Sequence, residues 1–433
     1  MTTFEERYSN LNPEQKDAVD SIYGPLLVVA GPGTGKTEIL SLRVANILRK
    51  TDTAPKNILC LTFTTSAAYN MRERLTKLIG RDAYKVAINT FHSFGVDIIS
   101  TYPEYFYKGM TFNPVDDVSQ IEILEEILTE LPYDNDLGNL HPEGGYVYLK
   151  DIKSVIGELK KAGITPDEFR NILAINKKSL ESLNPSIHSI FSQRISNKLI
   201  GSIECFIENL KPVDLGYAIS LNLQSIPKIL KSSLEEAMEN VSMLGKNTPL
   251  SEWKRDKTTK DDSGNQELKD TKYLEKLFSL ADVYEKYQML MYERRYYDFD
   301  DMILNAISGI EENNSLKYEL QDRYEYILVD EFQDTNDAQM KLINQITIYD
   351  ESDRIPNIMA VGDDDQAIYK FQGAELSNIL NFTDTYSETK IVTITSNYRS
   401  TQEILDIARY VILQGKERLE NKYSHIDKEI VSA

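Results

Sequence analysis

The sequence predicts an α/β protein whose mostly parallel sheet carries a phosphate-binding loop and is interrupted by a helical insertion. Three observations support this class. Short apolar, β-branched runs alternate with helical stretches, as in parallel sheets covered by helices. A glycine-rich segment directly follows the first of these runs. The middle of the chain has helical periodicity with almost no strand signal.

The expected strands are short runs of apolar residues that a parallel sheet would bury on both faces. They are residues 26–29, 58–63, 86–89, 326–329, 358–361 and 391–394. Residues 105 to about 290 break this rhythm and predict an inserted helical domain. Within it, residues 251–270 are dense in charge and poor in aliphatic side chains, so we expect a mobile loop there.

Composition limits the class of protein. The chain has 433 residues, 41% hydrophobic and 27% charged, and the N-terminus lacks the pattern of a signal peptide. No apolar stretch approaches the roughly 20 residues of a membrane span, so we expect a cytoplasmic protein that does not bind membranes. The formal net charge of −20 excludes a uniformly basic nucleic-acid binder, but not a locally positive groove. Cys60 and Cys205 are expected to be buried free thiols.

A phosphate-binding loop is predicted between the first strand and the helix that follows it. Small residues allow backbone N–H groups to close around phosphates, and the helix start adds further donors. We expect Lys36 to reach the β- and γ-phosphates and Thr37 to offer its hydroxyl to Mg²⁺. The segment reads Ala30, Gly31, Pro32, Gly33, Thr34, Gly35, Lys36, Thr37. Ala30 takes the place of the usual first glycine, and it is small enough for the loop to form.

Two adjacent acids follow the predicted strand at 326–329. Phosphoryl transfer to water needs a carboxylate that holds Mg²⁺ and a group that orients or deprotonates the water. Asp330 fits the first role and Glu331 the second. Adjacent acids at a strand end are common on protein surfaces, and the phosphate-binding loop upstream is what favours the catalytic interpretation here.

Eight segments, in order, resemble the motifs of the UvrD/Rep/PcrA helicases of superfamily 1. They are LNPEQKDAV, AGPGTGKT, LTFTTSAAYNMRERL, INTFHSFG, YDFDDMI, VDEFQDTN, VGDDDQAIYKFQGA and TSNYRST. The resemblance runs from about residue 9 to the end and is weakest through the helical insertion. It implies a RecA-like P-loop NTPase domain in two segments, 1–108 and 289–385. Residues 109–288 would form the inserted helical domain, and 386–433 would begin a second RecA-like domain.

The resemblance assigns roles around the nucleotide. Gln15 matches the glutamine that reads adenine, and its alternative is a solvated polar residue near a helix start. Gln366 matches the residue that senses the γ-phosphate. Tyr398 matches the tyrosine that stacks on adenine, and Arg399 matches an arginine that contacts the γ-phosphate. Glu38 departs from the family, which often has an arginine over the adenine at this position.

Four further residues are candidates for binding single-stranded DNA, which proteins hold by stacking bases on aromatic rings. Phe63, Tyr369 and Phe371 lie beside nucleotide motifs. His92 lies where the family contacts the DNA backbone. For each of these residues, the alternative is an ordinary place in the hydrophobic core.

The resemblance implies an ATP-dependent 3′–5′ DNA helicase or single-stranded DNA translocase that acts in DNA repair or replication. Its cofactors would be ATP and Mg²⁺. Its partners would be single-stranded DNA, 3′-tailed duplex DNA and accessory repair or replication proteins. The family's second RecA-like domain supplies an arginine across the ATP cleft, and we expect that residue to lie beyond this sequence. An ATP- and DNA-binding module without motor activity, or the helicase arm of a helicase–nuclease, remain alternatives.

Overall fold

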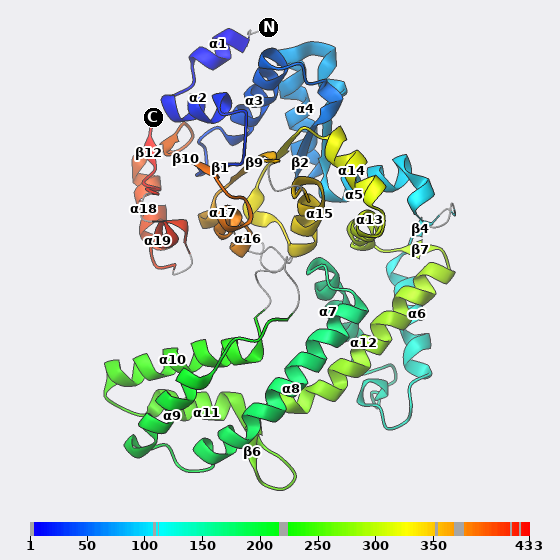
Figure 1. The fold of residues 1–433 in the computed structure, drawn as a ribbon, viewed down its shortest axis with the longest axis vertical. Helices are drawn as coiled ribbons and strands as arrows, with labels where there is room; N and C mark the ends of the chain where they lie inside the picture. The colour runs from blue at the N-terminus through cyan, green and yellow to red at the C-terminus, as the bar shows by residue number, and fades with distance from the viewer. Residues whose placement is uncertain are drawn as a thin grey trace. The chain divides into compact units, whose positions relative to one another are not determined.

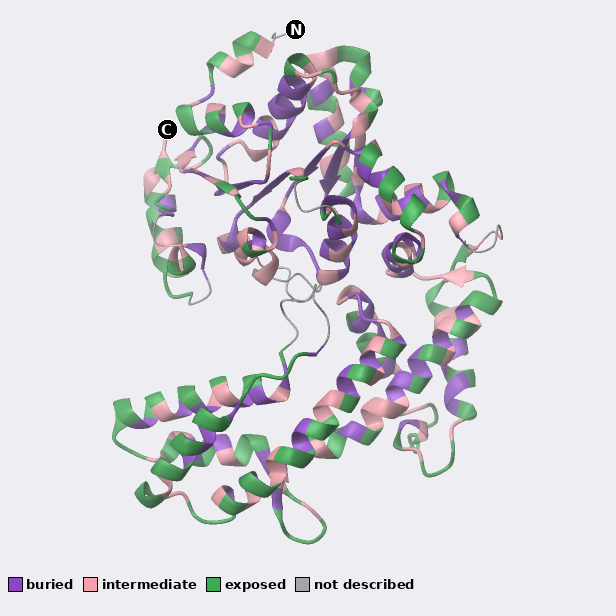
Figure 2. Cartoon of the chain, viewed as in Figure 1, coloured by how far each residue is buried: buried purple, intermediate pink, exposed green. Residues whose placement is uncertain are grey.

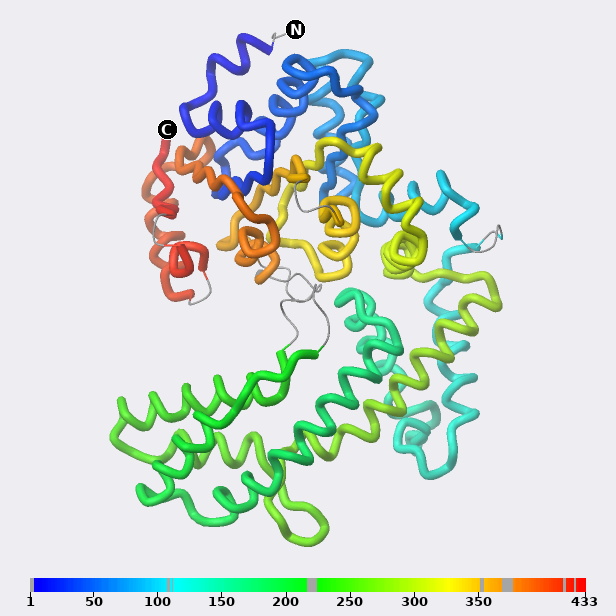
Figure 3. The backbone as a smooth tube through the Cα atoms, in the orientation of Figure 1, coloured from blue at the N-terminus to red at the C-terminus, as the bar shows by residue number. Residues whose placement is uncertain are grey.

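A computed structural model describes residues 4–106, 110, 112–215, 224–350, 354–367, 376–415, 418–423 and 426–433. The chain divides into two compact units, which are described separately. The first contains residues 1–114, 160–163 and 297–433, and the second contains 115–159 and 164–296. The colour gradient in Figure 3 lets the reader follow the chain out of the first unit after α5 and back into it before α13.

The first unit is built on a six-stranded sheet in the order β10-β1-β9-β8-β2-β3, and every neighbouring pair is parallel (Figure 1). The strands are β1 (Leu26–Ala30), β2 (Ile58–Thr62), β3 (Ala87–Thr90), β8 (Tyr326–Val329), β9 (Asn357–Gly362) and β10 (Lys390–Ile394). All six lie within one or two residues of the predicted runs. The prediction of a mostly parallel α/β sheet is therefore confirmed.

Alternate residues of the sheet enter two separate cores, because successive side chains on a strand point to opposite faces. Leu27 and Val29 of β1 join one core, whereas Leu26 and Val28 join the other. Both cores are composed of buried apolar side chains, and β1, β2 and β8 are buried along their lengths, as the purple centre of the sheet in Figure 2 shows. Burial on both faces explains why these strands read as continuous apolar runs.

Helices cover both faces of the sheet. Residues from α2, α3 and α4 enter the core that contains Leu26, and residues from α5, α13, α14 and α15 enter the other. The helices of this unit are α1 (Phe4–Ser9), α2 (Pro13–Asp20), α3 (Lys36–Lys50), α4 (Thr65–Ile79), α5 (Phe91–Thr101), α13 (Asp301–Glu312), α14 (Asn314–Arg323), α15 (Asp337–Thr347), α16 (Leu376–Leu380), α17 (Phe382–Thr385), α18 (Gln402–Ile412) and α19 (Leu419–Lys422).

The second unit is mainly helical. Its helices are α6 (Asp117–Thr129), α7 (Leu149–Lys161, whose last two residues belong to the first unit), α8 (Pro166–Phe191), α9 (Asn197–Asn209), α10 (Ile226–Leu244), α11 (Thr248–Lys257) and α12 (Asp270–Glu293). Among the described helices of the chain, none has the length and apolar character that a membrane crossing requires. The described residues also form short strands outside the six-stranded sheet. They are β4 (Asn113–Pro114), β7 (Tyr296–Tyr297), β11 (Ser396–Asn397) and β12 (Val431–Ser432), and two further strands form the hairpin described next.

Three expectations from the sequence are wrong. Residues 251–270 are not a loop: α11 leads into an antiparallel hairpin of β5 (Thr258–Lys260) and β6 (Gln266–Leu268), anchored by buried Trp253 and Leu268. The strand expected at 391–394 does not open a separate domain, since β10 pairs with β1 at the edge of the first sheet. Cys60 is a buried free thiol as expected, but Cys205 is exposed. The remaining segment boundaries stay predictions.

Candidate functional site

The phosphate-binding loop connects the fully buried strand β1 to α3. Gly33 and Gly35 have left-handed backbone angles, with φ of +72° and +88°, which a residue with a side chain would adopt only with strain. The Thr34 hydroxyl donates to the carbonyl of Gly31 at 2.7 Å and braces the turn. The N-terminus of α3, which begins at Lys36, therefore faces the loop, as anion binding requires.

Lys36 and Glu331 meet directly. The Lys36 Nζ lies 2.6 Å from the Glu331 Oε2, with side chains 10% and 36% exposed. Glu331 follows β8 in a left-handed conformation, with φ of +48°, which aims its carboxylate at the loop. An anion that enters the loop must therefore compete with this carboxylate for the lysine.

Two further acids lie at the same edge of the sheet. Burial, followed by the neighbouring charge of Glu331, raises the pKa of Asp330 to about 6, although Lys36 opposes the shift. The same causes raise the pKa of Asp334 to about 6. Asp334 Oδ1 is buried without a hydrogen-bond partner in the structure as described. Sequence reasoning did not single out Asp334, although it lies in the same VDEFQDTN motif.

A cavity of about 520 Å³ brings several of the predicted residues together. Asp330 and Glu331 line it from the end of β8, Gln366 from the turn after β9, and Phe63 from the end of β2. Its lining residues are Phe63, Thr64, Ala67, Asp330, Glu331, Gln333, Asp334, Asp365 and Gln366. The expected catalytic acids, the expected γ-phosphate sensor and one candidate base-stacking ring thus line one cavity.

Gln15 is buried, at 4% exposure, and its amide joins two elements. Its Oε1 accepts from the backbone N–H of Asn12 at 3.0 Å, which forms the capping box of α2. Its Nε2 donates to the Thr34 carbonyl at 2.9 Å. The alternative of a solvated residue at a helix start is therefore wrong, because Gln15 ties that helix start to the phosphate-binding loop. Its contact with adenine stays a prediction.

Residues after β10 cover the same loop. The backbone N–H of Tyr398 donates to the Gly33 carbonyl at 3.0 Å, and the Asn397 side chain donates to the Pro32 carbonyl. A Cβ atom added to Gly33 would lie 2.7 Å from the Cβ of Arg399. Tyr398 is 57% exposed. The structure thus places Tyr398 and Arg399 next to the loop. It also places Asn397 there, a residue that the sequence motif did not mark as a site residue.

The candidate DNA-binding residues separate into three groups. Phe63 lines the cavity described above, whereas Tyr369 and Phe371 lie outside the described residues. The His92 ring is in the first turn of α5 and stacks on Phe299, with ring centroids 3.7 Å apart. Burial lowers the pKa of His92 to about 4, so the ring is neutral at pH 7. Phe299, which is 62% exposed, was not predicted.

The parallel sheet, the glycine-rich loop and the acids after β8 define a P-loop protein with a RecA-like domain. Comparison with known sequences agrees. Residues 11–387 match the family model described as the UvrD/REP helicase N-terminal domain. The match covers most of the chain, and the chain therefore belongs to the UvrD/REP helicase family.

Several bacterial proteins are similar over nearly the whole chain. The ATP-dependent DNA helicase PcrA of Bacillus subtilis is 28% identical over 410 residues, which cover 95% of this chain and 40% of that protein. The protein of the same name from Staphylococcus epidermidis is 28% identical over 411 residues, or 94% of this chain and 41% of that protein. The chain thus spans about two fifths of the length of these curated relatives.

Proposed function

We propose that the protein acts as an ATP-dependent DNA helicase or single-stranded DNA translocase that moves 3′ to 5′ in DNA repair or replication. Membership of the UvrD/REP family supports this, as do the relatives whose names state an ATP-dependent DNA helicase. The substrates would be single-stranded DNA and 3′-tailed duplex DNA, and accessory repair or replication proteins would be its partners.

The nucleotide site would hold ATP with Mg²⁺. The loop of residues 30–37 would cradle the phosphates, with Lys36 on the β- and γ-phosphates. Gln15 and Tyr398 would contact the adenine. Arg399 would balance charge on the γ-phosphoryl group, and Gln366 would sense that group.

The residues present fit Mg²⁺. Asp330 and Asp334 are buried carboxylates with raised pKa values, and one oxygen of Asp334 lacks a partner in the described structure. Mg²⁺ is typically held by one or two protein oxygens together with substrate phosphates, so a small number of carboxylates is enough. Asp330 and Thr37 would hold the ion, which supplies charge neutralisation on the phosphates.

The observation that carries the proposal is the shared cavity. Glu331 and Gln366, which would respond to the γ-phosphate, line the same space as Phe63, a candidate ring for base stacking. A change at the γ-phosphate would therefore reach the DNA-binding surface through adjacent side chains. A translocase needs an affinity for single-stranded DNA that changes with the bound nucleotide.

The first test is ATP turnover with and without single-stranded DNA. We expect DNA to stimulate turnover, and Glu331→Gln to lower kcat by about 100-fold to 10,000-fold, the usual contribution of a general base. Lys36→Ala should instead weaken nucleotide binding. Parent-like turnover in both variants would rule out this site as the place of hydrolysis.

The direction of movement needs a separate test. Strand displacement should occur on duplexes with a 3′ single-stranded tail and not on matched duplexes with a 5′ tail. Phe63→Ala should weaken binding of single-stranded DNA, because each stacked base contributes about 1 to 3 kcal/mol. Equal displacement from both tails would contradict the proposed polarity.

A second candidate function is an ATP- and DNA-binding module without motor activity. The Lys36–Glu331 ion pair favours it, because in this arrangement the loop lysine and the expected base neutralise each other. ATP binding without DNA-stimulated turnover would support the module. A helicase arm within a helicase–nuclease is a further alternative, and it would show both turnover and DNA cleavage in the complete protein.

A further inference from the structure

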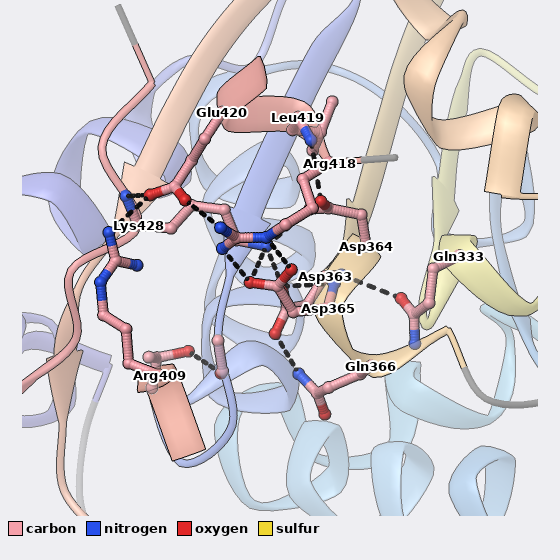
Figure 4. Close-up of polar contacts among 12 residues, drawn as sticks. Gln333, Asp363, Asp364, Asp365, Gln366, Arg409, Arg418, Leu419, Glu420 and Lys428 are labelled. Carbon is pink, nitrogen blue, oxygen red and sulfur yellow. Dashed lines mark hydrogen bonds and ion pairs between the residues drawn. The ribbon is translucent and has the colours of Figure 1, made fainter. Parts of the chain in front are cut away.

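Three consecutive acids follow β9, and a single lysine reaches all of them (Figure 4). The Nζ of Lys428 lies 2.6 Å from Asp363 Oδ1, 2.6 Å from Asp364 Oδ1 and 2.7 Å from Asp365 Oδ2. The Lys428 side chain is 3% exposed, and those of Asp363 and Asp364 are 1% and 0% exposed. Each of these charges would be costly to bury alone, so the buried ammonium group and the three carboxylates depend on one another to stay charged inside the protein.

Arg418 completes the charge balance of this acid cluster. It binds Asp365 through two parallel contacts, Nε to Oδ1 at 2.7 Å and Nη2 to Oδ2 at 2.8 Å. The backbone N–H of Leu419 donates to Asp364 Oδ2 at 2.8 Å. Glu420 links Arg418 to the backbone of Lys428: its Oε2 lies 2.7 Å from the Arg418 Nη1, and its Oε1 accepts from the backbone N–H of Lys428 at 2.8 Å. Both cations come from the last 16 residues of the sequence.

Hydrogen bonds continue from the acid cluster into the nucleotide site. Asp363 Oδ2 accepts from Gln366 Nε2 at 2.7 Å, so the same carboxylate holds both Lys428 and the expected γ-phosphate sensor. The backbone N–H of Asp363 donates to Gln333 Oε1 at 3.0 Å. Gln333 Nε2 donates in turn to Glu331 Oε2 at 3.0 Å, and that oxygen also contacts Lys36.

The segment that carries Lys428 also touches the phosphate-binding loop. A Cβ atom added to Gly31 would lie 2.3 Å from Ile430 Cδ1 and 3.9 Å from Asp363 Oδ2. The backbone N–H of Val431 donates to the Thr395 carbonyl at 2.9 Å, which holds the segment beside the residues that cover the loop. Lys428 therefore lies on a short segment that is fixed at the loop and at the acid cluster.

We propose that Lys428 is a positioning residue for ATP hydrolysis, which fixes Asp363 and through it the side chain of Gln366. This rests on the proposed function. Lys428 need not touch the nucleotide. It holds the Asp363 carboxylate in the orientation that accepts from Gln366. The backbone N–H of the same residue donates to Gln333, which in turn contacts Glu331, so Asp363 is linked to both Gln366 and Glu331. Such alignment matters because misplacement by about 1 Å can cost about a hundredfold in rate.

The test compares Lys428 with Lys422, which lies at the end of α19. Lys428→Met should lower kcat for ATP about 10-fold to 100-fold and leave KM for ATP nearly unchanged, because the loop still binds the phosphates. Lys422→Met is the matched control. Lys422 Nζ contacts the Leu380 carbonyl at 2.7 Å, Asn381 at 2.8 Å and Asp384 at 2.9 Å, none of which belongs to the acid cluster. The control should keep the parent kcat.

Two more variants guard against a simple loss of folding. Lys428→Arg keeps the charge and should recover most of kcat. Asp364→Asn combined with Lys428→Met removes one unpaired buried carboxylate that does not contact Gln366. This double variant should regain thermal stability but keep the low kcat.

The outcomes separate the two proposals. A parent protein without ATP turnover in the presence of single-stranded DNA would overturn the proposed function, and this inference with it. Turnover in the parent together with an unchanged kcat in the folded double variant would overturn the positioning role alone. If Lys422→Met lowered kcat as much as Lys428→Met does, the positioning role would be overturned as well.

Discussion

The acids after β8 and the acids after β9 belong to neighbouring strands but differ in how their charge is balanced. After β8, Lys36 contacts Glu331, while burial raises the pKa of Asp330 and of Asp334 to about 6. After β9, Lys428 contacts all three aspartates and Arg418 binds Asp365 with two bonds. The first group has one lysine, which contacts only Glu331 among the contacts described, whereas in the second group Lys428 contacts all three aspartates and Arg418 adds a second cation.

The pKa of Asp365 illustrates the difference. Its burial would raise the pKa, but the hydrogen bonds from Arg418 and the charge of Lys428 outweigh burial and lower it. At Asp364, by contrast, burial outweighs Lys428 and raises the pKa. It is the contacts with Lys428 and Arg418 that suit the acids after β9 to fixing the protein's own side chains, whereas the acids after β8 are suited to receive a cation from solution. Because Gln333 bridges the two groups, the second can orient the first.

The largest expected effect comes from removing a cation of the closed cluster. Arg418 is buried, and Arg418→Met would leave the partly buried Asp365 and Glu420 with one fewer partner. Breaking a buried pair typically costs about 3 to 5 kcal/mol. We expect that loss in the free energy of unfolding, measured by urea denaturation at pH 7 in Mg²⁺-free buffer.

Lys85→Met is a suitable control, because the Lys85–Asp82 pair is 66% and 53% exposed. Exposed pairs contribute less than about 1 kcal/mol. Similar small losses of stability in both variants would show that Arg418 contributes no more than an exposed ion pair does. The proposed difference between the acids after β8 and those after β9 would then be wrong.

A medium effect is expected for metal binding after β8. A divalent ion needs ionised Asp330, so its affinity should fall as pH drops through about 6. For one proton, the apparent Kd should rise about tenfold between pH 7 and pH 5. Mn²⁺ can replace Mg²⁺ as a probe, with free Mn²⁺ measured by electron paramagnetic resonance in the absence of nucleotide.

Two variants sharpen this measurement. Asp330→Asn should bind Mn²⁺ weakly at both pH values and lose the pH step. Asp364→Asn, in the closed cluster, should bind it like the parent. If Asp364→Asn weakened Mn²⁺ binding as much as Asp330→Asn, the two groups of acids would not differ in the way the structure indicates.

The strands of the sheet could be predicted because the apolar pattern that a buried strand needs lies within a few consecutive residues. A parallel strand buried on both faces needs a continuous apolar run, and β1, β8 and β9 have one. Which strands become neighbours is not local. The run at 391–394 predicted a strand correctly, but its pairing with β1 depends on contacts with residues more than 350 positions earlier. The β5–β6 hairpin was missed because charged side chains on its exposed positions obscured the buried Thr258 and Leu268.

The candidate site follows the same division. Lys36, Thr37, Asp330 and Glu331 were identified because each lies in a short motif at the end of a strand, and the structure brings Lys36 and Glu331 into contact. Lys428 gave no signal. A lysine in a polar segment resembles a solvated residue, and its partner acids lie more than 60 residues earlier. Only the folded chain shows it to be buried.

The smallest expected effect is a gain in stability at Asp334. Its pKa in the folded protein, about 6, lies above its ordinary value of 3.8, so the folded state binds a proton more tightly than the unfolded state does. This group therefore costs stability at pH 7, and the cost disappears as pH falls through 6 toward 4. Asp334→Asn should raise the free energy of unfolding by about 1 kcal/mol at pH 7 in Mg²⁺-free buffer and by less at pH 5. Asp363→Asn, which loses its contact with Lys428, should be destabilised at pH 7 instead. Destabilisation of Asp334→Asn at pH 7 would mean that the ionised Asp334 carboxylate is stabilised in the folded protein, and that the acids after β8 do not differ from those after β9 in this respect.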